Sequence, residues 1–518
     1  MKNIYQLFND VVRSSPNKVA CICDTKQVSY QQLENDISNL SANLLNLGVK
    51  QGDRIAVFCP NSIDFAVILF AAAKIGIAVA PLPISLKGAA LKNSIERIDC
   101  QGVISWQSVT KKLLDSQFNI PLLVNIGRKV DNQIQLDELI KHQCFSEGIA
   151  SSVGRFSVDC DFILTLTSGS TGDPKPIVFT QKNKIDRAIT ATANIYDLSS
   201  NDTTLVSTPL YHSLAQRSLI LPLLLGGTAI ILPKFTVESW IEAIYQHRVS
   251  FLFAVSSQLT TLIPHLKTAY DLSSLRCIVS SSAILSNESK VQLMKRLPCK
   301  LHECYGASEL GVVSDFCVNQ VQNKVGSVGK GLPILSVKIT DENRVKVDSY
   351  QLGEIACRSP TQFKGYFLQP ENTKKAYDDD GFFYTGDLGY LDEEGFLFYA
   401  GRKKDIIITG GINVYPQDIE NVVNTINDID ECVAFGVSDK QFGEVIKLVY
   451  TSSVEVDLMS IKKVCLTELT DYQQPRYIEA VDQLPKSSLG KILRQKVREP
   501  STITKTRRAK ATTYKRMP

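Results

Sequence analysis

The chain has 518 residues, and its 44% apolar and 21% charged residues are typical of a globular protein and exclude a disordered one. Lys and Arg number 57 against 53 Asp and Glu, so the net charge of +4 excludes a dedicated nucleic-acid binder. The length allows about three domains, or two of unequal size. The 13 cysteines, without a C-x-x-C pair, indicate free thiols in a reducing compartment, so we expect a cytoplasmic protein.

The most apolar stretch of the chain runs from residue 65 to residue 84. A membrane-spanning helix needs about 20 uninterrupted apolar residues, whereas this stretch is broken by a lysine, a glycine and two prolines. We therefore expect no transmembrane segment. The pattern predicts instead a buried helix over 65–74, followed by a buried strand over 75–82.

Short apolar runs alternate with amphipathic segments through the first four hundred residues. This alternation predicts parallel sheets covered by helices, which is an α/β fold. The runs expected to form strands are residues 54–59, 102–105, 121–125, 162–166, 204–207 and 228–232.

The character of the sequence changes from about Gly381, where turn residues become dense. A new alternating unit then opens at 401–404. We predict an N-terminal domain over 1–400, a hinge at 401–404 and a C-terminal domain over 405–498. Residues 499–518 hold six Lys or Arg and one acid, and we expect a basic, disordered tail there, with contact to an anionic surface as the alternative.

The strongest local motif is Leu166-Thr-Ser-Gly-Ser-Thr-Gly-Asp-Pro-Lys175, which follows a predicted strand. Glycines allow backbone N–H groups to converge on an anion, hydroxyls donate further hydrogen bonds, and Lys175 adds a positive charge. The motif differs from the G-x-x-x-x-G-K-[ST] loop, because Pro174 stands where that pattern has its second glycine. We predict a phosphate-binding loop made by Lys175 together with Thr167, Ser168, Gly169, Ser170, Thr171 and Gly172.

Four further segments of unusual composition follow in the chain. Each alone has an ordinary structural explanation, such as a core tyrosine, a turn aspartate or solvated charges. Their occurrence together and in this order indicates one shared function. They are Glu303-Cys-Tyr-Gly-Ala-Ser-Glu309, Tyr384-Thr-Gly-Asp-Leu388, the charged turn and glycine loop of 401–416, and 484–494 with its lysine after a glycine turn.

With these motifs, residues 4–497 resemble the adenylate-forming superfamily, which contains acyl-CoA synthetases, the adenylation domains of non-ribosomal peptide synthetases, and luciferases. The resemblance implies an α/β fold (α+β overall), with a large N-terminal domain of two αβ subdomains plus a small β-barrel, and a small mobile α+β C-terminal domain. It also implies a reaction in two halves. A carboxylate attacks the α-phosphorus of Mg-ATP to give an acyl-adenylate and pyrophosphate, and a thiol then attacks the adenylate.

The resemblance assigns ATP contacts to matching positions of this chain. Thr167–Gly172 and Lys175 would bind the β- and γ-phosphates, and Tyr305 would stack on adenine. Ser308, where the family usually has threonine, would bind the α-phosphate, and Glu309 would bind Mg²⁺. The remaining nucleotide contacts would come from Ser282, Ala283, Gly306, Asp387 at the ribose, and Arg402 at the ribose or a phosphate.

The C-terminal part matches family positions that act in catalysis. The attack brings two anions together, so a cation is required at the reacting centre. Lys491 matches the catalytic lysine and Lys404 matches the hinge residue. Gly410 and Gly411 would line the tunnel that admits pantetheine in the second half-reaction.

The segment Thr208–Ser213 distinguishes branches of the superfamily. Amino-acid-activating members usually carry an aspartate there that pairs with the substrate ammonium, whereas this chain has His212. A buried ammonium without a carboxylate partner is costly. We therefore expect an acid without an α-amine and interpret His212 as a pocket gate, with a structural histidine as the alternative. The short connection from Glu309 to Gly326 lacks the insertion of the fatty-acyl ligases that serve carrier proteins, which favours coenzyme A over carrier-protein phosphopantetheine as acceptor.

Two departures from the family pattern bear on the size of the acid. Ser280-Ser-Ser-Ala-Ile284 replaces a common Ser-Gly-Gly-Ala-Pro, and Cys304 replaces a common glycine, so the added side chains should narrow the pocket to small acids. We predict an ATP-dependent carboxylate:CoA ligase. One alternative is a stand-alone adenylation enzyme that loads an acyl or amino acid onto an acyl or peptidyl carrier protein. The other alternative is a homologue without catalytic activity. The presence of Lys175, Glu309 and Lys491 argues against it.

Overall fold

The structure is a computed structural model, and it describes residues 1–116, 118–142, 156–166, 175–266, 270–320, 322–324, 326–487, 490–499 and 512–513. The chain divides into two compact units. The first unit consists of Met1–Val325, Leu332–Ser336 and Arg358–Gly381. The second unit consists of Gly326–Gly331, Val337–Cys357 and Phe382–Pro518.

The first unit contains an eight-stranded sheet that is parallel except at one end, where β9 pairs antiparallel with both of its neighbours. Parallel strands need crossover connections, and α3 (Ile63–Ile75), α4 (Gly88–Ile98) and α5 (Gln107–Asp115) supply them. In spatial order the strands are β19 (Gly365–Tyr366), β9 (Pro176–Thr180), β8 (Asp161–Leu166), β4 (Ala78–Pro81), β3 (Arg54–Phe58), β5 (Gly102–Trp106), β6 (Leu123–Ile126) and β7 (Ile134–Gln135).

A second sheet of this unit is parallel in its centre and antiparallel at both ends. Its crossover helices are α10 (Val237–His247), α11 (Ser256–Leu262) and α12 (Asn287–Arg296). The strands that the first unit contributes to it are, in spatial order, β15 (Gly311–Cys317), β14 (Lys300–Ala307), β13 (Cys277–Ser281), β12 (Phe251–Val255), β10 (Thr203–Val206), β11 (Thr228–Ile231), β1 (Val19–Cys23) and β2 (Lys26–Ser29).

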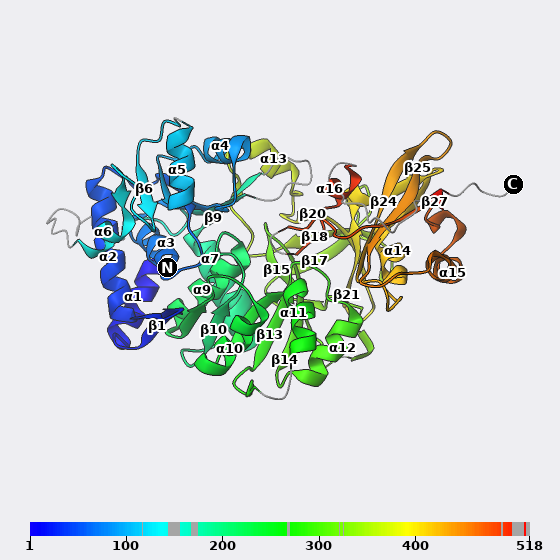
Figure 1. Ribbon diagram of the computed structural model, residues 1–518, viewed down its shortest axis with the longest axis horizontal. Helices are drawn as coiled ribbons and strands as arrows, with labels where there is room; N and C mark the ends of the chain where they lie inside the picture. Colours follow the sequence, from blue (N-terminus) through cyan, green and yellow to red (C-terminus); the bar gives the residue numbers. More distant parts are fainter. Residues whose placement is uncertain are drawn as a thin grey trace. The chain divides into compact units, whose positions relative to one another are not determined.

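Helices that are apolar around most of their circumference lie between the two sheets. α3 contacts both β4 and β1, one strand from each sheet, and nearly all its side chains are buried, as expected for a helix covered on every side. α9 (Ser213–Leu225) packs on β10, β11 and β12 and contacts α7 (Gln181–Ala188), which packs on β9 (Figure 1). Further helices of the unit are α1 (Ile4–Ser14), α2 (Tyr30–Asn46), α6 (Leu136–Lys141), α8 (Asn194–Tyr196) and α13 (Pro370–Lys375).

The second unit contains a four-stranded sheet and a C-terminal α+β part. The four-stranded sheet has the order β17 (Ser336–Thr340), β18 (Gly353–Arg358), β20 (Phe383–Leu391) and β21 (Leu397–Arg402). In the C-terminal part, α14 (Pro416–Val423) and α15 (Leu458–Glu468) bury one apolar core with the strands. These strands are β23 (Ile412–Val414), β22 (Ile407–Thr409), β25 (Gly443–Thr451), β26 (Tyr477–Ala480) and β27 (Thr512–Thr513), with β24 (Glu431–Asp439) paired to β25. A short helix, α16 (Arg494–Arg498), lies between β26 and β27 in the chain.

The α/β fold with a large N-terminal and a smaller C-terminal part is confirmed, and each of the predicted strands is present. The predicted strand over 75–82 is shorter, because α3 extends to Ile75 and Gly76, at φ 72°, ends it in the left-handed conformation. In the described part of the chain, no helix is both long and apolar enough to cross a membrane. The hinge at 401–404 stays a prediction, and the predicted tail lies almost wholly outside the described residues.

Candidate active site

Three buried cations lie where α7 and α9 meet. Lys184 and Arg187 come from α7 and Arg217 comes from α9, and burial lowers the pKa of each. Neighbouring positive charges lower the pKa of Lys184 and Arg187 further. The Lys184 ammonium donates to Gln216 Oε1 at 2.9 Å and to Ser213 Oγ at 3.3 Å, both of which are neutral acceptors. Positive charge therefore accumulates in the layer between the two sheets.

Arg187 holds the segment that contains two predicted nucleotide-site residues. Its Nη2 donates to the carbonyl oxygens of Ser308 at 3.1 Å and Glu309 at 2.9 Å, and its Nε donates to the carbonyl of Thr361 at 2.8 Å. The Phe363 N–H donates to the same Glu309 carbonyl at 2.6 Å. Because one planar guanidinium bonds three carbonyls, it fixes the turn between β14 and β15 against the following chain.

A tyrosine connects the predicted phosphate lysine to the predicted metal ligand. The Tyr366 hydroxyl donates to Glu309 Oε1 at 3.2 Å, and the Lys175 ammonium lies 5.4 Å from the centre of the Tyr366 ring. The pairing of β19 with β9 brings them together, since it places Tyr366 opposite Ile177, two residues after Lys175. The loop Thr167–Gly172 lies outside the described residues.

The end of β14 is shaped by a bulge. The register with β15 shifts between Tyr305 and Gly306, and such a shift re-aims the side chains beyond it. A Cβ on Gly306 would lie 2.0 Å from the Gly311 carbonyl oxygen, so only glycine fits there. Tyr305 is buried and Ser308 is exposed, which leaves the serine accessible to a ligand.

The loop after β13 carries Ser282 in an unusual conformation. Ser282 has φ 77°, a region that glycine adopts without strain and serine rarely adopts. Ser282 is exposed and Ala283 is half-buried. Backbone strain of this kind concentrates at functional sites, and the conformation also explains why the family pattern has glycine here.

His212 is the residue directly before α9, at its N-cap position. Its ring centre lies 4.4 Å from that of Tyr211, and burial lowers the pKa of His212 to about 4. The imidazole is therefore neutral at pH 7 and can face an uncharged part of a substrate.

Asp387 and Arg402 form an ion pair in the second unit. They are direct neighbours in the β20–β21 ladder, and Arg402 Nε lies 2.7 Å from Asp387 Oδ1. Asp387 is buried and Arg402 is half-exposed. The two residues predicted to contact the ribose are thus adjacent.

Lys491 lies at the end of a small hairpin in the second unit. The Ser487 N–H donates to the Lys491 carbonyl at 2.8 Å, and Gly490, at φ 75°, is part of the turn. The residue as a whole is exposed, yet desolvation of its ammonium, with Arg402 nearby, lowers the pKa of Lys491. Asp387 and Asp405 act in the opposite direction, so Lys491, Asp387 and Arg402 belong to one charged cluster.

A buried ion pair positions the segment that follows Lys491. Arg494 donates from both terminal nitrogens to the Glu420 carboxylate, at 2.5 and 2.6 Å, and also to the Ala434 carbonyl at 2.7 Å. Glu420 Oε1 also accepts the Ala434 N–H at 2.8 Å. This two-point contact ties the chain three residues after Lys491 to α14 and β24.

The other predicted residues of the second unit lie on exposed turns. Lys404 lies in a short 3₁₀ turn, Lys403–Asp405, and desolvation of its ammonium lowers its pKa. Gly410 and Gly411, at φ 58° and 80°, form the turn between β22 and β23, where any other residue would be strained.

The structure thus brings Lys175, Ser308 and Glu309 together in the first unit, and Asp387, Arg402, Lys404 and Lys491 together in the second. The sequence analysis missed the residues that hold these groups in place, because a single arginine or tyrosine outside a motif carries no signal. They are Arg187 and Tyr366 in the first unit, and Glu420 and Arg494 in the second. Lys184 and Arg217, the other two buried cations of the first unit, carry no sequence signal for the same reason.

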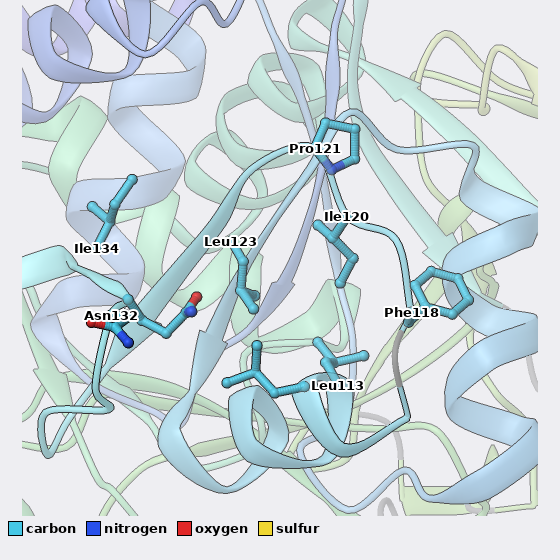
Figure 2. A pocket seen from close by; sticks show the side chains of 9 residues that line it. Leu113, Phe118, Ile120, Pro121, Leu123, Asn132 and Ile134 are labelled. Atoms are coloured by element: carbon cyan, nitrogen blue, oxygen red, sulfur yellow. The ribbon is translucent and has the colours of Figure 1, made fainter.

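A pocket of about 290 Å³ lies away from all of these residues (Figure 2). It opens beside β6 and β7, the edge of the eight-stranded sheet opposite to β19. None of the predicted ATP or acyl contacts lines it; its walls are Leu113, Leu114, Phe118, Ile120, Pro121, Leu123, Asn132, Gln133 and Ile134.

Known proteins match this chain over nearly its whole length. A long-chain-fatty-acid–CoA ligase of Bacillus subtilis is 29% identical over 97% of this chain and 95% of its own length. A 2-succinylbenzoate–CoA ligase of Bacillus pumilus is 27% identical over 93% of this chain and 95% of its own length. The crystal structure of ATP-bound MatB from Rhodopseudomonas palustris superposes with a TM-score of 0.86 at 25% identity, over 96% of this chain and 99% of that one.

The family matches divide the chain into two segments. Residues 8–367 match the AMP-binding enzyme family and residues 418–491 match the AMP-binding enzyme C-terminal domain. The first segment contains Lys175, Tyr305 and Glu309, and the second ends at Lys491. The chain therefore belongs to the AMP-binding enzyme family, within the adenylate-forming superfamily.

Proposed function

We propose that this protein is an ATP-dependent carboxylate:CoA ligase that forms an acyl-AMP and pyrophosphate and then an acyl thioester. The observation that carries the proposal is the Ser308–Glu309 turn, held by Arg187 and joined through Tyr366 to Lys175. This arrangement places a hydroxyl, a carboxylate and an ammonium at one site, as phosphoryl chemistry on ATP requires. Relatives named as CoA ligases over 93–97% of this chain support the thiol acceptor.

The residues of the first unit bind and orient the nucleotide. The Ser308 hydroxyl donates to the α-phosphate, Lys175 neutralises the β- and γ-phosphates, and Tyr305 stacks on adenine. Glu309 fits a Mg²⁺ ligand, because its carboxylate is only half-buried and a magnesium site commonly uses one or two carboxylates together with phosphate oxygens. When bound, Mg²⁺ offsets the charge that develops on the phosphate oxygens.

The residues of the second unit contact the ribose, stabilise negative charge during adenylation and make room for the thiol acceptor. Asp387 accepts from the ribose hydroxyls, and Arg402 adds positive charge beside it. Lys491 stabilises the negative charge that develops as the carboxylate attacks the α-phosphorus, and its lowered pKa reflects the desolvated position of its ammonium. Gly410 and Gly411 provide a turn without side chains, which allows pantetheine to pass close to the backbone. Lys404, at the predicted 401–404 hinge, would absorb the backbone rotation between the two half-reactions.

An acid-dependent ATP–pyrophosphate exchange assay tests the first half-reaction. A panel of carboxylic acids should include at least one that supports exchange, and thioester should then form from the same acid when coenzyme A is added. Exchange without thioester from coenzyme A, but with thioester on a phosphopantetheinyl carrier protein, would favour the alternative acceptor. Binding of ATP without exchange for any acid would contradict the enzyme proposal.

A further inference from the structure

Arg217 is a deeply buried cation that makes no ion pair within the described part of the chain. The residue is 7% exposed, and its Nε and Nη1 atoms are buried without a hydrogen-bond partner among the described residues. Its guanidinium lies 5.5 Å from the centre of the Phe253 ring, with Cys304 and Tyr196 as the nearest titratable groups that favour its charge. In the described chain, no carboxylate lies within ion-pair distance of it.

The residues around Arg217 are those predicted to form the acyl pocket. β13 pairs Ser280 with Glu303, so the next residues along each strand, Ser281 and Cys304, share the opposite face of the sheet. The Cys304 thiol lies in hydrogen-bonding contact with the Ser281 side chain. Because α9 packs on this sheet and Arg217 acts on Cys304, the guanidinium lies over the face that presents Ser281 and Cys304.

The neighbouring cations Lys184 and Arg187 make the binding of an anion beside Arg217 more favourable. The charge of Arg217 lowers the pKa of both Lys184 and Arg187, and the acceptors of these two cations are an amide, a hydroxyl and backbone carbonyls. A guanidinium keeps its proton in proteins, so it cannot relieve the repulsion by becoming neutral. A buried charge of this kind is costly unless an opposite charge reaches it.

We propose that Arg217 binds a second anionic group of the acyl substrate, so that the enzyme acts on compact carboxylic acids that carry another carboxylate distant from the reacting one. The inference rests on the proposed ligase function and names the substrate class of its acyl pocket. A carboxylate matches the planar donor pair of a guanidinium. The ring of Phe253 and the small side chains of Ser281 and Cys304 leave the charge pair in apolar surroundings, where it is strong.

The anionic oxygens could also come from a phosphate of ATP. The position of Arg217 favours the acid, because the residue borders Cys304 and Phe253 rather than Lys175 and Tyr366. The two sources are separated by kinetics, since loss of a nucleotide contact raises the KM for ATP with every acid, whereas loss of an acyl contact affects only acids that carry the second charge.

Pyrophosphate exchange with matched acids tests the proposal. Each α,ω-dicarboxylic acid is compared with the monocarboxylic acid of the same carbon number, in the wild type, in Arg217→Met and in the control Arg276→Met. We expect the wild type to prefer the dicarboxylic acid by about 100-fold in kcat/KM, and Arg217→Met to abolish this preference. Arg276 is a half-exposed guanidinium already paired with Asp202 at 2.7 Å, so Arg276→Met should keep the wild-type preference.

Thermal unfolding gives a second measurement. Ligand-free Arg217→Met should melt at the wild-type temperature or higher, because it removes an unpaired buried charge, and a dicarboxylic acid should raise the melting temperature of the wild type only. A lower melting temperature of ligand-free Arg217→Met would make the arginine structural. A raised KM for ATP with all acids would make it a nucleotide contact. Exchange with monocarboxylic acids alone would defeat this inference and leave the ligase function intact, whereas no exchange with any acid would defeat both.

Discussion

Adjacent residues of β14 point to opposite faces of the second sheet and meet two different cations. Glu303 faces α12 and pairs with Lys290 at 2.5 Å, with 3% and 1% of the two residues exposed. Cys304 faces α9 and meets Arg217, which no carboxylate of the described chain neutralises. One face of the strand therefore balances its buried charge within the fold, and the other face leaves a charge for a ligand to balance.

The second unit repeats this contrast within one segment. Arg494 is neutralised by Glu420 through two short hydrogen bonds. Lys491, three residues earlier, has no carboxylate within 4 Å in the part of the chain that the structure describes, although Asp387 and Asp405 influence its pKa. In both comparisons the cation that a carboxylate neutralises stabilises the fold, and we expect the cation without hydrogen-bonded carboxylate or carbonyl partners among the described residues, Arg217 or Lys491, to act on a ligand.

Lys491→Ala is the sharpest test of the rule in the second unit. We expect acyl-AMP formation to fall about 10³-fold, because the charge that stabilises the transition state is lost. Thioester formation from supplied acyl-adenylate should fall far less, because the adenylate already carries its leaving group. Pyrophosphate exchange and thioester formation measure the two halves, with the exposed Lys496→Ala as control. An equal loss in both halves would contradict the assignment of Lys491 to the first half.

Lys290→Met tests the structural side of the comparison. Removing one partner leaves the Glu303 carboxylate buried and unpaired, so the free energy of unfolding should fall by about 3–5 kcal/mol. Urea unfolding of the purified protein measures the change. The double variant Lys290→Met/Glu303→Gln should recover most of the loss, since it removes both charges and keeps an acceptor for the Leu285 N–H. If Lys290→Met is as stable as the wild type, the Lys290–Glu303 ion pair does not stabilise the fold.

Lys175→Ala should have a smaller effect, on nucleotide binding. In the proposed site the lysine contacts phosphates that leave as pyrophosphate, so we expect it to stabilise the ground and transition states about equally. We expect the KM for ATP to rise about tenfold with little change in kcat. Initial rates at varied ATP measure this, and Lys182→Ala, which loses only a surface ion pair with Asp186, is the control. An unchanged KM for ATP in Lys175→Ala would show that this lysine does not contact the phosphates.

Cys304→Gly addresses the width of the space beside Arg217. Removal of the side chain should raise kcat/KM for acids one or two carbons longer by about 3- to 10-fold. Exchange assays over a series of chain lengths measure the shift, with the buried Cys299→Ala as control. A wild type that already prefers long-chain acids, with no change in Cys304→Gly, would show that this side chain does not limit the pocket.

The sequence predicted the fold class and the strands, because each of these rests on local pattern, and the site residues in the motifs stay predictions. It could not predict Arg187 or Arg217, since each is a single cation in a helix whose neighbours come from segments far away in the chain. Thr361, which Arg187 holds, lies 174 residues away. The alternation of β14 does predict that Glu303 and Cys304 face apart, but the helix that covers each face is known only from the packing.

The Arg217 guanidinium also affects how long the protein persists in a cell. A ligand that binds only the folded state stabilises it in proportion to its concentration above the dissociation constant. If the acid neutralises Arg217, the amount of folded enzyme that escapes proteolysis will follow the supply of that acid. The rate at which the protein is degraded then depends on the concentration of its own substrate, without any separate regulatory domain.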